Sequence, residues 1–304
     1  MRNEFVQALI NNFSKYDKQV FITGDLGFMA LEDLEATFGD HFLNGGISEQ
    51  NIISIAASLA YQGYIPWVYS ISPFITLRPY EQIRNEVCHH NNNVKIVGNG
   101  GGYGYGIMGS THHNLEDIGV MRILPNMRVY VPCFNQDLEY CITQILEEQN
   151  PNYLRLNNTK LDLRIPYVPF SQWRKLKDGN RLIVISTGPV VANLFDLPSA
   201  ILSEIEVWTI SIFPFHDLPI ELISSINNGK GILTIEEHAS QCSLNESLAS
   251  VLLKNNVYPL SYDAINSEGY LSGKYGDQNF HQMESGLSGE KLLSKIINIL
   301  ENAY

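Results

Sequence analysis

The sequence predicts an α/β fold built from two doubly wound domains. Short runs rich in β-branched and aromatic residues alternate with longer segments of helical periodicity, as in a parallel sheet covered by helices on both faces. The chain also has 304 residues, which is more than one hydrophobic core usually holds. We place the first domain at 1–156, a linker at 157–180 and the second domain at 181–304.

The first domain contains five apolar runs that we predict to be strands. They are 19–23, 64–70, 94–98, 127–131 and 152–156. The segments between them have the period of amphipathic helices, at 3–16, 48–62, 75–92 and 135–148. Because strands and helices alternate, the strands should lie parallel in one sheet.

The region that follows has no steady period. Residues 157–180 carry prolines and charges, which is typical of a linker. A second alternating series begins after it, with predicted strands at 181–187, 206–212, 231–237 and 257–263. Its predicted helices are 189–202, 217–228, 242–255 and 288–302.

Composition narrows the class of protein. The formal net charge is −12, so no basic stripe is present to bind nucleic acid or an anionic membrane. No window approaches eighteen uninterrupted apolar residues and the N-terminus does not resemble a signal peptide, so we expect a cytoplasmic protein. The four cysteines lack zinc-site spacing, and we interpret Cys88, Cys133, Cys141 and Cys242 as free, mostly buried thiols.

A glycine-rich tract, GNGGGYGYGIMGSTHH, occupies residues 98–113. It contains GxGxxG at 104–109, but a dinucleotide loop needs a helix to begin directly after its glycines, and here polar STHHN follows. Adjacent histidines rarely bind one metal ion, and no further ligand spacing supports such a site. We interpret the tract as backbone that a flat ligand approaches closely, with His112 as a titratable partner and His113 as structural.

Two further stretches contain polar residues where strand-like runs end. The run HFLN (41–44) precedes the first stretch, and the predicted strand 64–70 precedes the second. In GISEQN (46–51), Ser48 is a plausible N-cap and Glu49 lies in the first helical turn; from pattern alone, a capping carboxylate is the favoured interpretation. In SPFITLRPYEQIR (72–84), Phe74 and Arg78 follow a predicted strand, so an aromatic face and a guanidinium could face a pocket there. Taken alone, Phe74 would be a core residue.

Taken together and in order, these motifs resemble a known family. GISEQNIISIAASLAYQGYIPWV, SPFITLRPYEQIRN and the 94–132 segment around the glycine tract are similar to the pyrimidine-binding domain of thiamine diphosphate-dependent transketolases, over most of 20–156. The second domain resembles the transketolase C-terminal domain, with local signal around LTIEEHASQC. The spacing from Phe74 to Tyr80 is closest to split transketolases, in which two polypeptides share the work of one chain.

The resemblance also implies a partner. The family holds the cofactor's diphosphate and its Mg²⁺ (or Ca²⁺) in a separate N-terminal domain with a GDG…N motif, which this sequence lacks. It therefore implies a C-terminal subunit that works only with an N-terminal transketolase subunit, in an α2β2 heterotetramer with a homodimeric core. No metal ligands are expected on this chain.

The resemblance assigns cofactor roles to five residues. Glu49 matches the carboxylate that bonds the ring nitrogen of the aminopyrimidine, and Ile47 lies beside it. Phe74 matches the aromatic that stacks on the pyrimidine, and Tyr80 a second aromatic of that pocket. Asp25, in TGDLG, matches an aspartate near the thiazolium end.

The resemblance also assigns substrate roles, with departures. His112 matches a histidine that faces the substrate and would steady developing alkoxide charge, and Arg78 is a further candidate substrate ligand. Met108 stands where transketolases acting on sugar phosphates carry an aspartate that contacts a substrate hydroxyl, and a thioether accepts only a weak hydrogen bond.

Three family groups that contact phosphate are replaced as well. A histidine falls on Gly100, a serine on Met29 and an arginine near Asn158. Losing such charge-assisted contacts would forfeit roughly 1.5–3 kcal/mol each. We therefore expect an acceptor other than a simple aldose phosphate, such as a nucleotide-activated ketosugar, with room provided by Gly100–Gly102; a partner subunit could instead supply the missing ligands.

The expected activity is that of a transferase of the transketolase type, which moves a two-carbon ketol unit from a ketose donor. Two alternatives stay open at this point. One is a thiamine-dependent enzyme that decarboxylates or condenses 2-oxoacids, and the other is a non-catalytic subunit kept for assembly.

Overall fold

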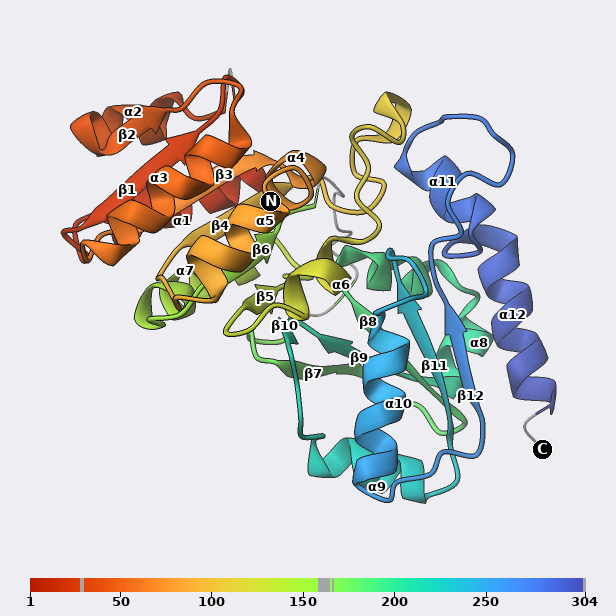
Figure 1. The fold of residues 1–304 in the computed structure, drawn as a ribbon. Coiled ribbons are helices and arrows are strands. Elements are labelled where there is room, and N and C mark those ends of the chain that lie inside the picture. The colour runs from red at the N-terminus through yellow and green to blue at the C-terminus, as the bar shows by residue number, and fades with distance from the viewer. Residues whose placement is uncertain (28–29, 158–164, 166, 303–304) are drawn as a thin grey trace.

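A computed structural model describes residues 1–27, 30–157, 165 and 167–302 (Figure 1). Two sheets organise it, and both consist mainly of parallel strands. In the described residues the first sheet has seven strands in the order β10-β5-β6-β4-β3-β1-β2, and the second has five in the order β12-β11-β8-β9-β7. The predicted α/β class is therefore confirmed.

The first sheet contains all five predicted strands and two short additional ones. Its members are β1 (Gln19–Thr23), β2 (Phe42–Asn44), β3 (Ile65–Ile71), β4 (Lys95–Asn99), β5 (Arg128–Tyr130), β6 (Asn152–Arg155) and β10 (Ile212–Phe213). Only the β10–β5 pair of this sheet is antiparallel among the described residues. Since β10 comes from the far half of the sequence, the chain returns to the first sheet after leaving it.

The helices around the first sheet agree with the predicted ranges at most places. They are α1 (Arg2–Phe13), α2 (Glu32–Phe38), η1 (Gly39–His41), α3 (Glu49–Tyr61), α4 (Ser72–Thr76), α5 (Tyr80–Gln82), η2 (Ile83–Cys88), η3 (Gly106–Met108), α6 (Asp117–Arg122) and α7 (Asp137–Glu147). The single helix predicted over 75–92 is wrong, because the chain breaks between α4 and α5. Pro79 disfavours helical backbone at the residue before it, which explains the break.

The second sheet is smaller. It contains β7 (Trp173–Lys177), β8 (Leu182–Thr187), β9 (Ile205–Ile210), β11 (Gly231–Glu236) and β12 (Tyr262–Ile265). Its helices are η4 (Pro189–Asp196), α8 (Ser199–Glu204), α9 (Ile220–Asn227), α10 (Leu244–Lys254), α11 (Gln278–Glu284) and α12 (Gly289–Asn302).

Three predictions in this half are wrong. The single helix predicted over 189–202 is divided into η4 and α8, because Pro198 disfavours helical backbone at Leu197, which is extended. The strand β7 lies inside the range predicted as a linker, where it pairs antiparallel with β9. The strand predicted at 257–263 begins only at Tyr262, because Pro259 lies inside the predicted range and suits a loop better than a buried strand. The division into domains at 156 and 181 stays a prediction.

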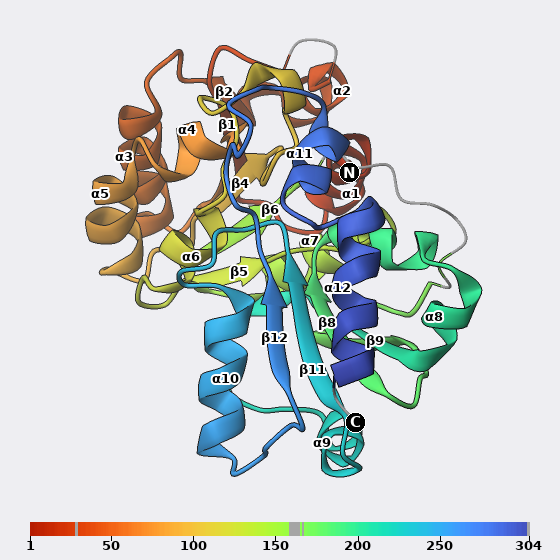
Figure 2. The ribbon, with the colours of Figure 1, turned by 90° about the vertical axis from the view of Figure 1, so that its right-hand side faces the viewer.

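Buried side chains lie on both faces of each sheet. On one face of the first sheet α1, α2 and α7 pack, with Phe5, Leu34 and Ile142 in the same cluster. A second cluster joins α3, η2 and α6 to α9 and α10, so it runs from the first sheet to the second. The remaining face of the second sheet is covered by η4, α8 and α12, and Figure 2 shows α10 and α12 on opposite sides of β11 and β12.

The burial of the cysteines tests one expectation from the sequence. Cys88, Cys133 and Cys141 are buried free thiols and Cys242 is an exposed one, as predicted. Within the described ranges, we find no helix with both the length and the apolar character that crossing a membrane requires.

Candidate active site

The residues singled out from the sequence gather at the carboxyl edge of the first sheet. Asp25 follows β1, Glu49 follows β2, Phe74 follows β3 and the glycine tract follows β4. These strands are neighbours in the order β4-β3-β1-β2, so parallel pairing brings their carboxyl ends together. Such an edge is where open α/β sheets bind ligands.

Glu49 begins helix α3 and its side chain is buried, with 9% exposed. Ser48 occupies the N-cap position as predicted, but its hydroxyl donates to the Gly45 carbonyl at 2.7 Å instead of capping the helix. The carboxylate lies in the first turn, where the helix dipole favours negative charge. An open hollow reaches it, lined also by Ile47, Gln50 and Arg78.

Arg78 makes two contacts in this hollow. Its Nη1 atom lies 3.0 Å from Glu49 Oε1, and its guanidinium carbon lies 3.7 Å from the centre of the Phe74 ring. The Phe74 ring in turn lies edge-to-face with the His112 ring, at 5.2 Å between centroids. Pairwise contacts thus connect Glu49 through Arg78 and Phe74 to His112.

The three other predicted cofactor residues have different positions relative to the hollow at Glu49. Ile47 lines the same hollow and is 80% exposed. Asp25 is exposed and lines a neighbouring hollow with Leu31 and Phe42. Tyr80 packs against the core, and its hydroxyl donates to the Val120 carbonyl at 2.9 Å, so its ring belongs to the protein interior more than to the hollow at Glu49.

The expectation that the triple glycine provides room for a ligand is wrong. A β-carbon on Gly100 would overlap the ring of Tyr105, and one on Gly101 would overlap the Arg155 side chain. At Gly102, the overlap would be with the Glu237 carboxylate. The protein's own side chains therefore fill the space that these glycines leave, and Gly100 is buried.

The adjacent histidines have different surroundings. His112 is partly exposed, and its Nδ1 lies 2.9 Å from the Thr111 hydroxyl. His113 is buried, with Nε2 at 2.8 Å from the Gly106 carbonyl and Nδ1 at 2.8 Å from the Tyr270 hydroxyl. Burial lowers the pKa of His113 to about 4. The structural interpretation of His113 is confirmed.

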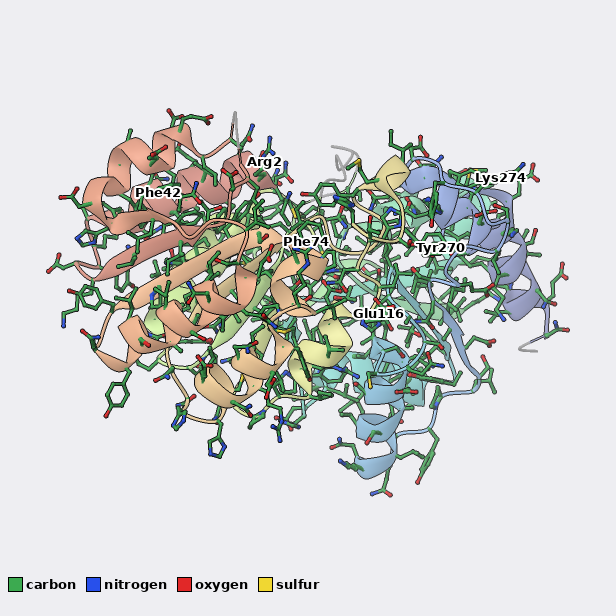
Figure 3. All side chains as sticks on the ribbon, turned by 45° about the horizontal axis from the view of Figure 1, so that its top comes forward. Arg2, Phe42, Phe74, Glu116, Tyr270 and Lys274 are labelled. Atoms are coloured by element: carbon green, nitrogen blue, oxygen red, sulfur yellow. The ribbon has the colours of Figure 1, made fainter. Side chains whose placement is uncertain are left out.

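A loop from the far half of the chain supports this turn. The Tyr275 ring packs on Gly109, and its hydroxyl lies 3.0 Å from that of Ser110. Figure 3 shows Phe74 on the side of the first sheet and Tyr270 on the side of this loop. Neither Tyr270 nor Tyr275 was predicted from the sequence, because residues 266–277 have no helical or strand period that would place them.

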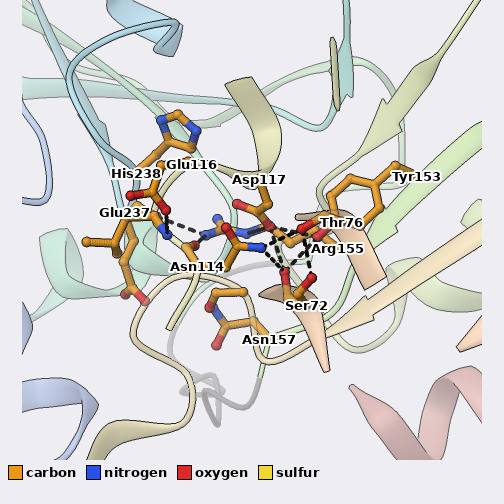
Figure 4. A network of polar contacts seen from close by, with 12 residues as sticks. Ser72, Thr76, Asn114, Glu116, Asp117, Tyr153, Arg155, Asn157, Glu237 and His238 are labelled. Atoms are coloured by element: carbon orange, nitrogen blue, oxygen red, sulfur yellow. Dashed lines mark hydrogen bonds and ion pairs between the residues drawn. The ribbon is translucent and has the colours of Figure 1, made fainter. Parts of the chain in front are cut away.

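Behind the glycine tract lies a buried polar network (Figure 4). Asp117 Oδ2 accepts from Arg155 Nε at 2.9 Å and from the Tyr153 hydroxyl at 2.7 Å. Asn114 Nδ2 donates to Ser72 Oγ at 2.9 Å, and Arg155 Nη2 donates to the Glu237 carbonyl at 3.0 Å. This network joins β6, α6 and α4 to the end of β11, and the sequence did not predict it.

The remaining predicted substrate residues lie at the edge of the site. Met108 ends η3 and is 53% exposed, beside the still more exposed Ile107. Asn158 and Met29 lie outside the described residues.

Comparison with known proteins places this geometry in a family. The family model described as the transketolase pyrimidine-binding domain matches residues 1–163 of the sequence. The chain belongs to the transketolase family. Its first half therefore carries the transketolase pyrimidine-binding domain, as the motifs around Glu49, Phe74 and the glycine tract predicted.

Several transketolase relatives have the length of this chain. A protein of Actinobacillus succinogenes, named as one of the subunits of an apulose-4-phosphate transketolase, is 27% identical over 86% of this chain and 86% of its own. A putative transketolase C-terminal section of Methanocaldococcus jannaschii is 30% identical over 98% of this chain and 95% of its own. A solved structure described as a split gene transketolase, an inactive beta4 tetramer, has the same fold, with a TM-score of 0.83 and 24% identity over 100% of this chain and 98% of that one.

Proposed function

We propose that this chain is the C-terminal subunit of a two-chain, thiamine diphosphate-dependent transketolase that transfers a two-carbon ketol unit. The observation that carries the proposal is the row of contacts that runs from Glu49 through Arg78 and Phe74 to His112 at the carboxyl edge of the first sheet. Relatives of the same length that are named transketolase subunits support it.

The residues present fit an aminopyrimidine. The guanidinium of Arg78 is planar and donates N–H groups, and it stacks on Phe74 while pairing with Glu49. An aminopyrimidine ring is also planar and offers N–H groups at its edge, so the same ring and carboxylate can hold it. Thiamine diphosphate would supply the nucleophilic carbon that makes and breaks carbon–carbon bonds.

Each residue of this chain then has a physical task. Glu49 would bond the ring nitrogen and hold a proton there, in a buried place where that hydrogen bond is strong. Phe74 would orient the ring by stacking. His112 lies against Phe74 and is partly exposed, so it can donate a hydrogen bond to charge that develops on a substrate oxygen.

The N-terminal partner would bind the diphosphate and its Mg²⁺, in the α2β2 arrangement and the cytoplasmic setting expected from the sequence. Relatives of matching length whose names make them one subunit of a larger transketolase support the need for such a partner.

For the acceptor, we propose a molecule other than a simple aldose phosphate. Met108 and Ile107 expose apolar surface at the turn that carries His112, where a carboxylate was expected from the family pattern. Arg155 cannot serve as a phosphate ligand, because Asp117 pairs with it and both side chains are buried. A nucleotide-activated ketosugar has enough neutral surface to suit such a rim.

The test is an assay of this chain combined with the proposed N-terminal partner subunit. We expect ketol transfer that requires both chains and thiamine diphosphate, and Glu49→Gln should lower kcat by at least a factor of about 100. Glu290→Gln, at an exposed position on α12, is the matched control. Undiminished turnover in the Glu49→Gln complex would refute the assigned role.

The acceptor is tested with the same complex. Xylulose 5-phosphate and ribose 5-phosphate should react slowly compared with nucleotide-activated ketosugars. Rapid turnover of the two pentose phosphates would contradict the altered acceptor and leave the transketolase assignment intact.

A further inference from the structure

The geometry points to Arg78 as an internal competitor of the cofactor: its guanidinium occupies the place of the aminopyrimidine and must leave before that ring can bind. This inference rests on the proposed function, because it assumes that Glu49 and Phe74 hold the pyrimidine. It differs from the role expected from the sequence, in which Arg78 is a substrate ligand.

Arg78 occupies contacts that the pyrimidine ring would also need. The guanidinium carbon lies 3.7 Å from the Phe74 ring centre, which is the separation of two stacked flat groups. The Nη1 atom lies 3.0 Å from Glu49 Oε1, where the ring nitrogen of the pyrimidine would also have to bond. Two planar groups cannot occupy one stacking position, so binding of the ring and of Arg78 there is mutually exclusive.

The Arg78 side chain can leave this position. Arg78 is 47% exposed, although its partner Glu49 is buried. Its backbone is held separately, by a hydrogen bond from Gln50 Nε2 to its carbonyl at 3.4 Å and by Pro79 in the break between α4 and α5. Rotation of the side chain alone can therefore uncover Phe74 without moving the helices.

Moving Arg78 away from Glu49 and Phe74 costs little free energy. An ion pair with one exposed partner and a cation–π contact at the surface are each weak. We expect their combined loss to cost about tenfold in cofactor affinity, which corresponds to about 1.4 kcal/mol. Arg78 would thus pair with the buried carboxylate of Glu49 before the cofactor binds. Its displacement by the cofactor would cost little free energy.

Binding of thiamine diphosphate with Mg²⁺ to the two-chain complex tests the inference by calorimetry. Arg78→Ala should bind about tenfold more tightly than the wild type, because nothing has to be displaced. Arg78→Lys should lie between the two, since an ammonium can pair with Glu49 but does not stack as a plane. Arg84→Ala is the control, because Arg84 lies on the following helix turn and contacts Asn85 at the surface.

The outcomes separate this inference from the proposed function. Wild-type binding together with equal or weaker binding by Arg78→Ala would overturn the competition and leave the proposed function intact. No binding by any variant would overturn both. Crystal structures of the complex with and without thiamine diphosphate give a second measure, and the guanidinium remaining on Phe74 in both would also overturn the competition.

Discussion

His112 and His113 are neighbours in sequence with different chemistry. A carbonyl oxygen only accepts hydrogen bonds, so the contact of His113 Nε2 with the Gly106 carbonyl places its proton on Nε2. Nδ1 is then the acceptor for the Tyr270 hydroxyl. With both ring nitrogens bonded and the ring buried, His113 holds the turn while His112 remains available to a ligand.

We predict a stability loss in acid that depends on His113. Its pKa falls from the ordinary 6.5 to about 4 on folding, because burial disfavours the charged ring and His281 lies against it. Above pH 6.5 both states are neutral. Between pH 6.5 and 4 only the unfolded state takes up a proton, so folding stability is lost in that window, by about 3 kcal/mol.

Urea unfolding at several pH values measures this effect. His113→Gln keeps a donor and an acceptor without titrating, so its stability should fall less than that of the wild type between pH 6.5 and 4. His216→Gln, at an exposed position, should follow the wild type. Parallel curves for the wild type and His113→Gln would contradict the prediction.

At single positions, the sequence predicted where a residue lies in the fold better than which side chains surround it. Glu49 and Phe74 were placed correctly at strand ends, because their motifs fix them relative to β2 and β3. The purpose of Gly101 and Gly102 was not predictable, because Arg155 and Glu237, which fill the space beside them, come from distant segments. A run of glycines indicates that a β-carbon would not fit at these positions. It does not indicate which neighbouring group takes up the space.

At the scale of elements, β7 shows why a strand was mistaken for a linker. Its buried positions alternate with partly buried ones, but one of the buried residues is an arginine. Arg174 Nη1 and Nη2 lie 2.7 and 2.8 Å from the two carboxylate oxygens of Asp137, at the start of α7. Arg174 thus makes the strand look less amphipathic in the sequence. The same residue joins β7 to α7 through its ion pair with Asp137.

We predict that this buried pair is essential for stability. Asp137→Ala leaves Arg174 charged and buried, and it removes the acceptor for the backbone N–H groups of Cys133 and Phe134. Removing one partner of such a pair costs about 3–5 kcal/mol. Asp263→Ala breaks the half-exposed pair with Lys295 and should cost less than about 1 kcal/mol. Urea unfolding compares the two, and equal costs would contradict the prediction.

Strand positions were more predictable than helix continuity. Strands β1, β8 and β11 lie within one residue of their predicted bounds, since buried parallel strands are uninterrupted apolar runs. The periodic segment 75–92 instead divides at Pro79, and periodicity alone does not report such a break. That break is also what places Arg78 beside Glu49.

At the scale of the whole molecule, the two halves meet at the glycine tract. Glu237, just beyond β11, accepts a hydrogen bond from the Tyr103 backbone at 2.6 Å and bonds to Gln278 and Gln282. Burial raises the pKa of its carboxyl group. A residue at the end of the second sheet therefore supports the glycine tract, although the predicted ligands of the site all come from the first half. No local sequence pattern shows this contact between distant segments.

This arrangement predicts that a change in the second half loosens the candidate site in the first. Glu237→Ala removes the acceptor for Tyr103 N–H, and a hydrogen bond to a charged group contributes about 1.5–3 kcal/mol. Hydrogen exchange measured by mass spectrometry should therefore be at least about tenfold faster over 100–113, where His112 lies. Glu237→Gln should show a smaller increase, because its side-chain oxygen can still accept from Tyr103. Glu290→Ala, on the exposed face of α12, should leave exchange unchanged. Unaltered protection of 100–113 in Glu237→Ala would show that the first half orders the glycine tract by itself.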